Sequence, residues 1–449
     1  MSLALEAAAR LAHRGASATD NPTEVHAREE AESLVKDVLL GDGLPVLGWR
    51  DVPVNPDVLG ASARSAMPTI RQVLVGRPAG SDDDSWERQR YVARREMEHR
   101  ALARGLEPFY VCSLSCRTVV YNGLLNGGQL GAFFPDLRDP AFETAIAVFH
   151  ERYATNTMPR WELAQPFRLL AHNGEINTRW GNRNAMAMRG PLLDAPAFGP
   201  LADRVRDPIR PRGSDSASLD NALQLLVRAG RSPVHATMML VPQAWEKYPD
   251  VEPAVKAFYE YHQFVLEPWD GPAALAYSDG VQVAVSLDRN GLRPCRYKIR
   301  ADGMVVAGFE VGVVDFDPRD VVETGKRGPG GVFLAGGEAG VRAHAAHRAS
   351  GAAPRGDACA AHLPGLCERN TRCLVRGAVA ARRARGSARL ALPPGRSGSP
   401  QGRPATHSLR SQGERRARTH SGAAGARCGA ATSRARRPAR AWGAGDRGA

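Results

Sequence analysis

Two periods of hydrophobic residues divide the first 340 residues into expected helices and strands. Apolar residues recur every three or four positions in the stretches that we expect to be helical, which are 3–13, 26–39, 140–152, 218–228 and 250–264. Short apolar runs predict strands over 109–123, 235–242, 273–280, 281–288, 295–299 and 303–310. Strands cluster at both ends with helices between them, and this order favours an α+β fold built of separate layers.

Two turn signals refine this picture. The "SDG" at 278–280 is typical of a hairpin, because Gly280 is free to adopt a positive φ. The stretch "RLLAHNGEINTRWGNRNAMAMRG" at 168–190 also holds an Asn-Gly pair, Asn173-Gly174, but residues with helical spacing follow it instead of a second alternating strand. A hairpin therefore does not account for this pair, which stands where a strand passes into a helix.

The pattern ends near Gly340. The following residues contain no Lys, Ile, Phe, Tyr or Met, and Trp442 is their one large aromatic residue. From 341 to the end there are 22 Arg and four acidic residues, a net charge of +18, whereas residues 1–340 carry −5. We therefore predict a tail over 339–449 that is either a disordered basic arm for a polyanion or the product of a GC-rich gene read in the wrong frame, and we favour the second.

Composition excludes several classes for the globular part. The chain has 449 residues, 43% of them hydrophobic, and no stretch approaches the roughly 20 apolar residues of a membrane span. Its opening has no basic region or cleavage site typical of a signal peptide, so we expect a cytoplasmic protein without a membrane partner. Nucleic acid is not an expected partner either, because the basic charge belongs to the tail. The seven Cys match no zinc or disulfide spacing: Cys112, Cys116, Cys295, Cys359, Cys367, Cys373 and Cys428.

Four stretches carry polar residues that a plain fold would not need. They are "HRGA" at 13–16, "FHERYATNT" at 149–157, the Asn173-Gly174 stretch and "RGSDSASLDNAL" at 212–223. Each also has an ordinary explanation: a helix C-cap at Gly15, a solvated Arg152, and helix N-capping by Ser214 or Asp215. Together, an Arg for a carboxylate and an Asp for an ammonium group are what recognition of a free amino acid requires.

These stretches resemble the class II, N-terminal-nucleophile, glutamine amidotransferases, and most closely the amidotransferase domain of the glutamate synthase large subunit. "NTMPRWELAQPFRLLAHNGEINTRWGNRNAM", "GSDSASLDNALQLLVRAGRSPVHATMMLVPQAWEK" and "LDRNGLRPCRYKI" carry the resemblance, which covers nearly all of 2–335. It implies a four-layer αββα sandwich over 1–338. It also implies hydrolysis of glutamine to glutamate and ammonia, feeding glutamate synthesis from 2-oxoglutarate.

The resemblance implies a role for each site residue. Asn173 and Gly174 would form an oxyanion hole, from one side-chain amide and one backbone N–H. Arg152 would bind the α-carboxylate of L-glutamine, Asp215 its α-ammonium group, and Arg14 would organise the wall near the nucleophile.

The family's nucleophile, an N-terminal Cys on a strand before the "HRGA" helix, has no counterpart here. Ser2 lies only 11 residues before His13, inside the helical pattern, so it cannot face Asn173 from a strand. Cys112, Cys116 and Cys295 lack a free α-amine, and we expect them to be buried small apolar residues. We therefore expect a catalytically inactive chain, with a non-catalytic glutamine- or glutamate-binding module and polyanion binding by the tail as alternatives.

Further segments of the family pattern are missing. "HRGASATDN" passes straight to "PTEVHAREEAESLV", so an internal gap of several dozen residues is expected near Asn21, with loss of sheet strands. The family's FMN and iron–sulfur cluster belong to domains beyond this one, and we expect no cofactor in this chain. The remaining glutamate synthase domains and a small subunit are the protein partners that the resemblance implies.

Overall fold

The computed structural model describes residues 25–345 apart from 107, 154–156, 194, 248–250, 311, 327–331 and 337–343. The helices are α2 (Val25–Gly41), α3 (Ala61–Ser65), α4 (Asp83–Ala103), α5 (Gly127–Phe133), α6 (Arg179–Arg189), α7 (Asp215–Arg228), α8 (Pro233–Leu240) and α9 (Pro253–His262). The strands are β1 (Val46–Asp51), β2 (Arg71–Val75), β3 (Leu170–Gly174), β4 (Ala273–Ser278), β5 (Gln282–Leu287), β6 (Arg296–Arg300), β7 (Val305–Gly308), β8 (Val321–Lys326), β9 (Val332–Gly336) and β10 (His344–Ala345). Short 3-10 turns connect several of these elements.

Three antiparallel sheets organise these strands. The largest has the order β10-β9-β5-β4-β3, the second the order β7-β6-β8, and the third pairs β1 with β2. The β4–β5 hairpin turns at Gly280, whose φ is +89°, so the predicted turn is confirmed. Strand β3 lies at one end of the five-stranded sheet, which leaves one of its edges without a strand in the described part of the chain.

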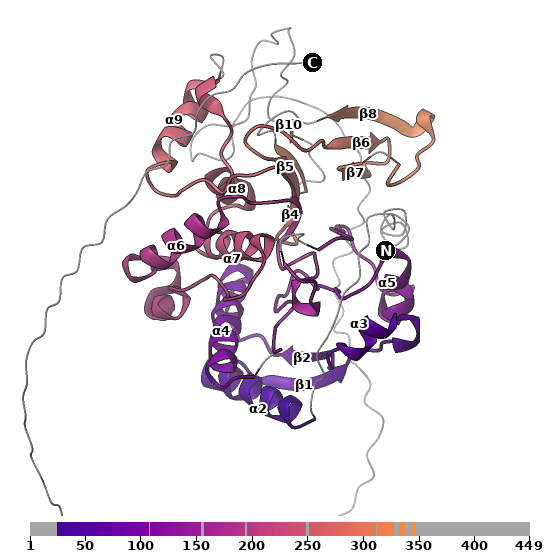
Figure 1. The fold of residues 1–449 in the computed structure, drawn as a ribbon, viewed down its shortest axis with the longest axis vertical. Helices are drawn as coiled ribbons and strands as arrows, with labels where there is room; N and C mark the ends of the chain where they lie inside the picture. The colour runs from indigo at the N-terminus through magenta and orange to yellow at the C-terminus, as the bar shows by residue number, and fades with distance from the viewer. Residues whose placement is uncertain are drawn as a thin grey trace, which may run out of the picture. The chain divides into compact units, whose positions relative to one another are not determined.

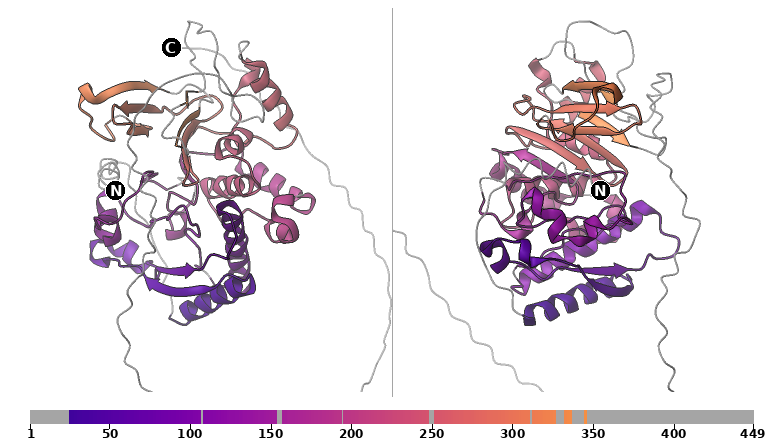
Figure 2. Two further views of the ribbon diagram at one scale, coloured as in Figure 1. Left: turned by 180° about the vertical axis from the view of Figure 1, so that it is seen from behind. Right: turned by 90° about the vertical axis from the view of Figure 1, so that its right-hand side faces the viewer.

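The alternation of side chains on β4 creates two cores. Leu275 and Tyr277 pack with the residues of α7 and α8, whereas Ala274 and Ala276 pack against Tyr297 and its neighbours on the three-stranded sheet. Figures 1 and 2 show the same order, with α7 and α8 on one side of β4 and β5 and β6–β8 on the other. The period of two therefore places apolar side chains on both faces of this sheet, as expected for strands buried on both faces.

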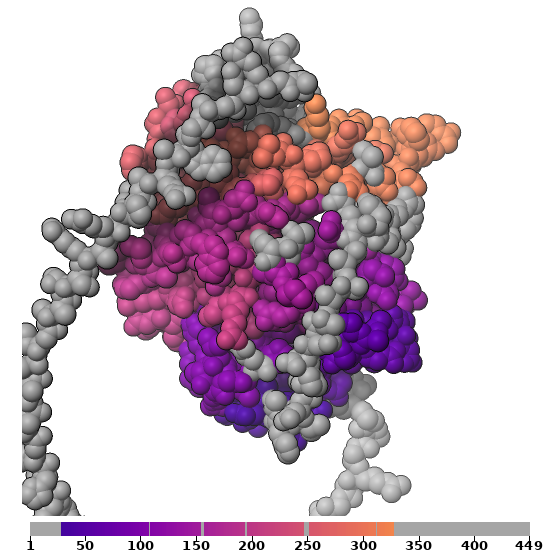
Figure 3. All heavy atoms as spheres, viewed as in Figure 1, coloured from indigo at the N-terminus to yellow at the C-terminus, as the bar shows by residue number. Residues whose placement is uncertain are grey.

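The layers confirm an α+β fold. Within the described residues we observe three of the four expected layers: the helices α7 and α8, the five-stranded sheet and the three-stranded sheet. A separate core joins α2 and α4 to the β1–β2 ribbon, with Leu34, Leu39, Trp86 and Met97 at its centre. Figure 3 shows these N-terminal elements, in indigo, and the strands β6 and β8, in orange, at opposite ends of the described surface.

Most predicted elements are confirmed, with α2, α6, α7, α9 and β4–β7 close to their expected positions. The strand predicted over 235–242 is wrong, because these residues belong to the helix α8. Ser232 caps that helix by accepting from the backbone nitrogen of His235, and Pro233 occupies its first turn. An apolar run of eight residues has no period that separates strand from helix, so the capping residues decide.

Two further predictions are wrong for a related reason. Residues 140–152 form no helix, because the side chains of Asp139 and Thr144 accept from the backbone nitrogens of Ala141 and Ile146 and so compete with helical bonds. Residues 109–123 form no strand. There, backbone donors bond to side chains instead, as Val120 N does to Ser113 Oγ.

Several sequence predictions lie outside the described residues. These are the helix over 3–13, Ser2, Arg14, the gap near Asn21 and nearly all of the tail. The short strand β10 pairs with β9 beyond the predicted domain boundary at 338. No helix in the described ranges combines the length and apolar character needed to cross a membrane.

Candidate functional site

Strand β3 presents its residues alternately to the two cores. His172 is paired with Leu275, which faces the helices, and Asn173 is paired with Ala274, which faces the three-stranded sheet. Paired residues of an antiparallel ladder point to the same side. His172 therefore belongs to the helix side of the sheet, and Asn173 points into the space between the two sheets.

Side chains from outside the strand fix the position of β3. Asp220 on α7 accepts from the backbone nitrogens of Leu169 and Leu170 at 3.0 and 3.2 Å. Gln165 makes two bonds to the backbone of His172: its Nε2 donates to the carbonyl at 3.1 Å, and its Oε1 accepts from the N–H at 2.6 Å. Its carboxamide thus bonds to the strand backbone as a neighbouring strand would.

Gly174 ends the strand in a conformation that only glycine tolerates. Its φ is +145°, and a Cβ at this position would lie 1.8 Å from the carbonyl oxygen of Pro272. Gly271 approaches from the other side, where a Cβ would lie 2.0 Å from the carbonyl oxygen of Glu175. Two backbones therefore meet in van der Waals contact here. The chain then continues into α6, so Asn173-Gly174 joins a strand to a helix, as its sequence context predicts.

A cavity of about 190 Å³ opens beside Asn173 between the two sheets. Arg152 lines the same cavity, at the end of the segment 145–152, which forms neither helix nor strand. The opposite wall consists mainly of apolar side chains from β5 and β7, with Glu310 beside them. The structure thus brings two of the predicted site residues, Asn173 and Arg152, to one cavity, although 21 positions separate them in the sequence.

Asp215 occupies a different environment, at the first residue of α7. The N-cap is Ser214, whose hydroxyl accepts from the backbone nitrogen of Ala217 at 3.0 Å. Asp215 is fully buried, and its Oδ2 accepts from the backbone nitrogen of Ile176 at 2.9 Å while its Oδ1 accepts from that of Ser216 at 2.8 Å. It does not line the cavity that Asn173 and Arg152 share.

His172 is a buried residue of the site that the sequence analysis did not identify. Its Nδ1 lies 2.7 Å from the hydroxyl of Ser216 on α7, and its Nε2 is buried without a hydrogen-bond partner. Burial lowers the pKa of His172 to about 4, against a smaller opposing effect of the Asp215 carboxylate. The imidazole is therefore neutral at physiological pH. The sequence does contain a signal for His172. Side chains alternate along a strand, so the residue before Asn173 must lie on the opposite face of the sheet.

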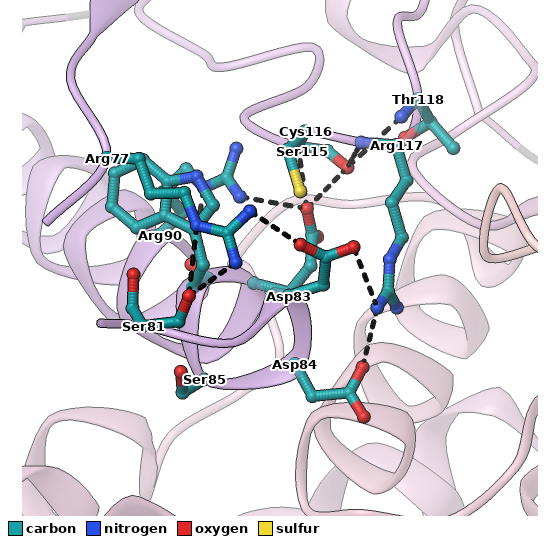
Figure 4. A network of polar contacts seen from close by, with 12 residues as sticks. Arg77, Ser81, Asp83, Asp84, Ser85, Arg90, Ser115, Cys116, Arg117 and Thr118 are labelled. Atoms are coloured by element: carbon teal, nitrogen blue, oxygen red, sulfur yellow. Dashed lines mark hydrogen bonds and ion pairs between the residues drawn. The ribbon is translucent and has the colours of Figure 1, made fainter. Parts of the chain in front are cut away.

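The three described cysteines differ in exposure. Cys295 is buried as expected, but Cys112 is half-buried and Cys116 is exposed, so that expectation is wrong for these two. Cys116 lies in a polar network with α4, in which Glu87 Oε1 accepts from its backbone nitrogen at 2.7 Å. Figure 4 shows this network, with Arg117 directed to Asp84 at the start of the helix.

Neither of the two accessible thiols, Cys112 and Cys116, is activated as a nucleophile. Desolvation raises the pKa of the Cys112 thiol, and desolvation together with the neighbouring Glu87 raises that of Cys116. The thiolate, which is the nucleophilic form, is thus disfavoured at both positions. In the described residues, no group of three or more His, Cys, Asp and Glu side chains is placed to hold a metal ion.

A family model and several known proteins match this chain. The family model of the class-II glutamine amidotransferases matches residues 21–342. The chain is 48% identical over 312 residues to ferredoxin-dependent glutamate synthase 2 of Synechocystis, covering 69% of this chain and 20% of that protein. It is 44% identical over 304 residues to the glutamate synthase [NADPH] large chain of Azospirillum brasilense, covering 68% of this chain and 20% of that one.

Among solved structures, the glutamine phosphoribosylpyrophosphate amidotransferase of B. subtilis is 19% identical, with a TM-score of 0.24, and covers 44% of this chain and 34% of that chain. The chain spans about a fifth of the length of the curated relatives that it matches. The family model covers well over half of the chain and contains Arg152, Asn173, Gly174 and Asp215. The chain therefore belongs to the class-II glutamine amidotransferase family.

Proposed function

We propose that this chain is the glutamine amidotransferase domain of a glutamate synthase, and that its described residues bind glutamine and stabilise the oxyanion formed from the side-chain amide. The observation that carries the proposal is the shared cavity of Asn173 and Arg152, next to a glycine whose conformation is fixed by close backbone contact.

The chemistry of the cavity suits this role. An Asn carboxamide donates N–H groups to a developing oxyanion, and a preorganised donor of this kind contributes about 3 kcal/mol to the transition state. Asn173 would supply this donor, with the backbone N–H of Gly174 as the second. Arg152 would hold the α-carboxylate through two parallel bonds, a geometry that Lys cannot provide.

Asp215 would bind the α-ammonium group in the same proposal. Its carboxylate already accepts two backbone bonds, and an ionised carboxylate offers about four acceptor positions, so it retains capacity for a further donor. Asp215 is fully buried and does not line the cavity of Asn173 and Arg152. Binding of the ammonium group would therefore need a local rearrangement.

We further propose that a polypeptide of this sequence binds glutamine without hydrolysing it. Both accessible described thiols are held as thiols, so neither offers the thiolate that would attack the glutamine amide. In the complete enzyme, the ammonia would pass to further synthase domains for transfer to 2-oxoglutarate, with a small subunit as partner. The length of the relatives supports this larger assembly.

Calorimetry with L-glutamine tests the proposal. We expect saturable binding by the purified chain, a loss of at least tenfold in affinity for Arg152→Lys, and no ammonia release above the blank. Arg319→Lys is the matched control, because Arg319 is 89% exposed and pairs only locally with Asp317. Absence of binding, or an equal loss in the control, would overturn the proposed binding site. Steady ammonia release would overturn the proposed inactivity alone.

A further inference from the structure

The outer face of the three-stranded sheet carries a second cavity. Alternation along β6 places Tyr297 and Ile299 in the core between the two sheets. Arg296 and Lys298 are exposed on the opposite face, which Figure 1 shows as part of the orange layer formed by β6–β8. The cavity on this face has a volume of about 400 Å³, which is within the range typical of small-molecule sites.

The register of the sheet explains which residues line this cavity. Two successive rungs of outward-facing residues contribute to it: Gly308, Arg296 and Lys326 in the first, and Val306, Lys298 and Thr324 in the second. Paired residues of an antiparallel ladder point to the same side, so these six positions belong to one surface. The loop after β7 lines the cavity as well, through Glu310, Gly312, Val313 and Val314.

Three cations of this surface have no ion-pair partner in the described part of the chain: Arg296, Lys298 and Lys326. Arg296 and Lys326 are exposed and lie directly opposite each other on β6 and β8, and like charges in such a pair repel each other. Glu323 on β8 does not neutralise them. It is paired with Ile299 and so belongs to the other face, where its carboxylate accepts from the Tyr297 hydroxyl at 2.7 Å.

The cavity therefore has an excess of positive charge. Glu310 is the one acidic residue of its lining, so three cations and one carboxylate leave two positive charges in excess. Lys298 also lies 6.0 Å from the centre of the Phe316 ring, and this cation–π contact leaves its charge unneutralised. The two excess charges match a ligand with two negative charges.

We propose that this cavity binds an aliphatic dicarboxylate of about five carbons, with one carboxylate between Arg296 and Lys326 and the other at Lys298. Residues two positions apart on a strand are separated by about 6.8 Å. The carboxyl carbons of an extended five-carbon dicarboxylate are about 5 Å apart, and the flexible lysine side chains bridge the remaining distance. A single small anion would neutralise one rung and leave the other without a partner. Val306 and Val314 offer apolar contacts to the methylene groups of the ligand.

This cavity is separate from the proposed glutamine site. Gly308, Glu310 and Val313 line both cavities, and no other residue is shared between the two linings. None of the three unpaired cations borders the cavity of Asn173 and Arg152. The proposal therefore does not depend on glutamine binding, and its test is carried out without glutamine.

The experiment is a calorimetric titration of the full chain with glutarate, malonate and acetate, at constant ionic strength in chloride. We expect saturable binding of glutarate at one site per chain, about tenfold tighter than that of malonate, which has the same charge but carboxyl carbons only about 2.5 Å apart. Acetate should bind more weakly than either. Lys298→Gln should weaken glutarate binding by about fivefold or more and bring it close to that of malonate, because the second carboxylate loses its partner.

Lys36→Gln is the matched control, because Lys36 is an exposed lysine of α2 that does not line the cavity. Its affinity for glutarate should equal that of the parent chain. The proposal is overturned if glutarate does not bind beyond chloride, or if malonate binds as tightly as glutarate. It is also overturned if Lys298→Gln and Lys36→Gln bind glutarate equally, since the binding then belongs to other basic residues of the chain.

Discussion

Asp215 Oδ2 accepts a hydrogen bond from the backbone nitrogen of Ile176 at 2.9 Å, across 39 positions of sequence. This bond ties the first residue of α7 to the segment that follows Asn173-Gly174. The residue expected to bind an ammonium group therefore also holds the two halves of the site together, and its substitution should affect stability as well as binding.

The first prediction concerns this bond. Asp215→Asn should lower the free energy of unfolding by about 1–3 kcal/mol, because a buried, charged acceptor of two backbone N–H groups is replaced by a neutral amide that brings its own donors. Urea unfolding measures the change. Asp203→Asn is the control, because Asp203 is 76% exposed, and we expect less than about 0.5 kcal/mol there. Equal stability of Asp215→Asn and the parent chain would contradict the structural role.

The second prediction concerns the close approach of two backbones at Gly174. Gly174→Ala should destabilise the chain by about 3 kcal/mol or more, because the new Cβ would overlap the carbonyl oxygen of Pro272. Gly181→Ala, in the first turn of α6, meets nothing within 4 Å and should stabilise by about 0.5–1 kcal/mol. Denaturant midpoints of the two variants should thus move in opposite directions. A midpoint of Gly174→Ala equal to or above that of the parent chain would show that the backbones at Gly174 are not in contact.

The third prediction is a pH dependence that belongs to His172. Its pKa is about 4 in the folded chain and 6.5 in its ordinary range, so the unfolded chain binds more protons between these values. Stability should therefore fall as the pH drops from about 6.5 to 4, by roughly 3 kcal/mol in total, and change little from this source outside that window.

His172→Gln supplies the comparison for this pH dependence. Other groups, such as the buried Glu98, whose pKa is lowered in the folded chain, also reduce stability when acid protonates them. The measured quantity is therefore the difference in free energy of unfolding between parent and variant at each pH. We expect this difference to shrink by roughly 3 kcal/mol from pH 7 to pH 4. A difference that stays constant over this range would mean that the imidazole is protonated as easily in the folded chain as in the unfolded one.

The apolar period predicted the elements in which it is clear and missed those whose conformation is decided by polar side chains bonding to the nearby backbone. Alternation is strong in β4 and β5, which face two cores, so their positions and the turn at Gly280 were predictable. The segment 140–152 has helical spacing, yet it forms no helix, because nearby side chains accept from its backbone donors. The spacing of apolar residues does not record that competition.

The site shows the same division. Asn173, Gly174 and Arg152 were identified through motifs, and the structure places Asn173 and Arg152 on one cavity. Gln165, by contrast, acts through its side chain on a backbone seven positions away, in a bond pattern that sequence spacing does not specify.

The alternation of β3 has a consequence for how this chain can change over time. Two adjacent residues of this strand have different contacts: His172 is packed against α7, and Asn173 borders the cavity. A substitution at His172 alters the packing of the helices against the sheet, and so alters stability. A substitution at Asn173 alters which ligand can bind in the cavity. Ligand specificity and stability can therefore evolve independently, through substitutions at two adjacent residues.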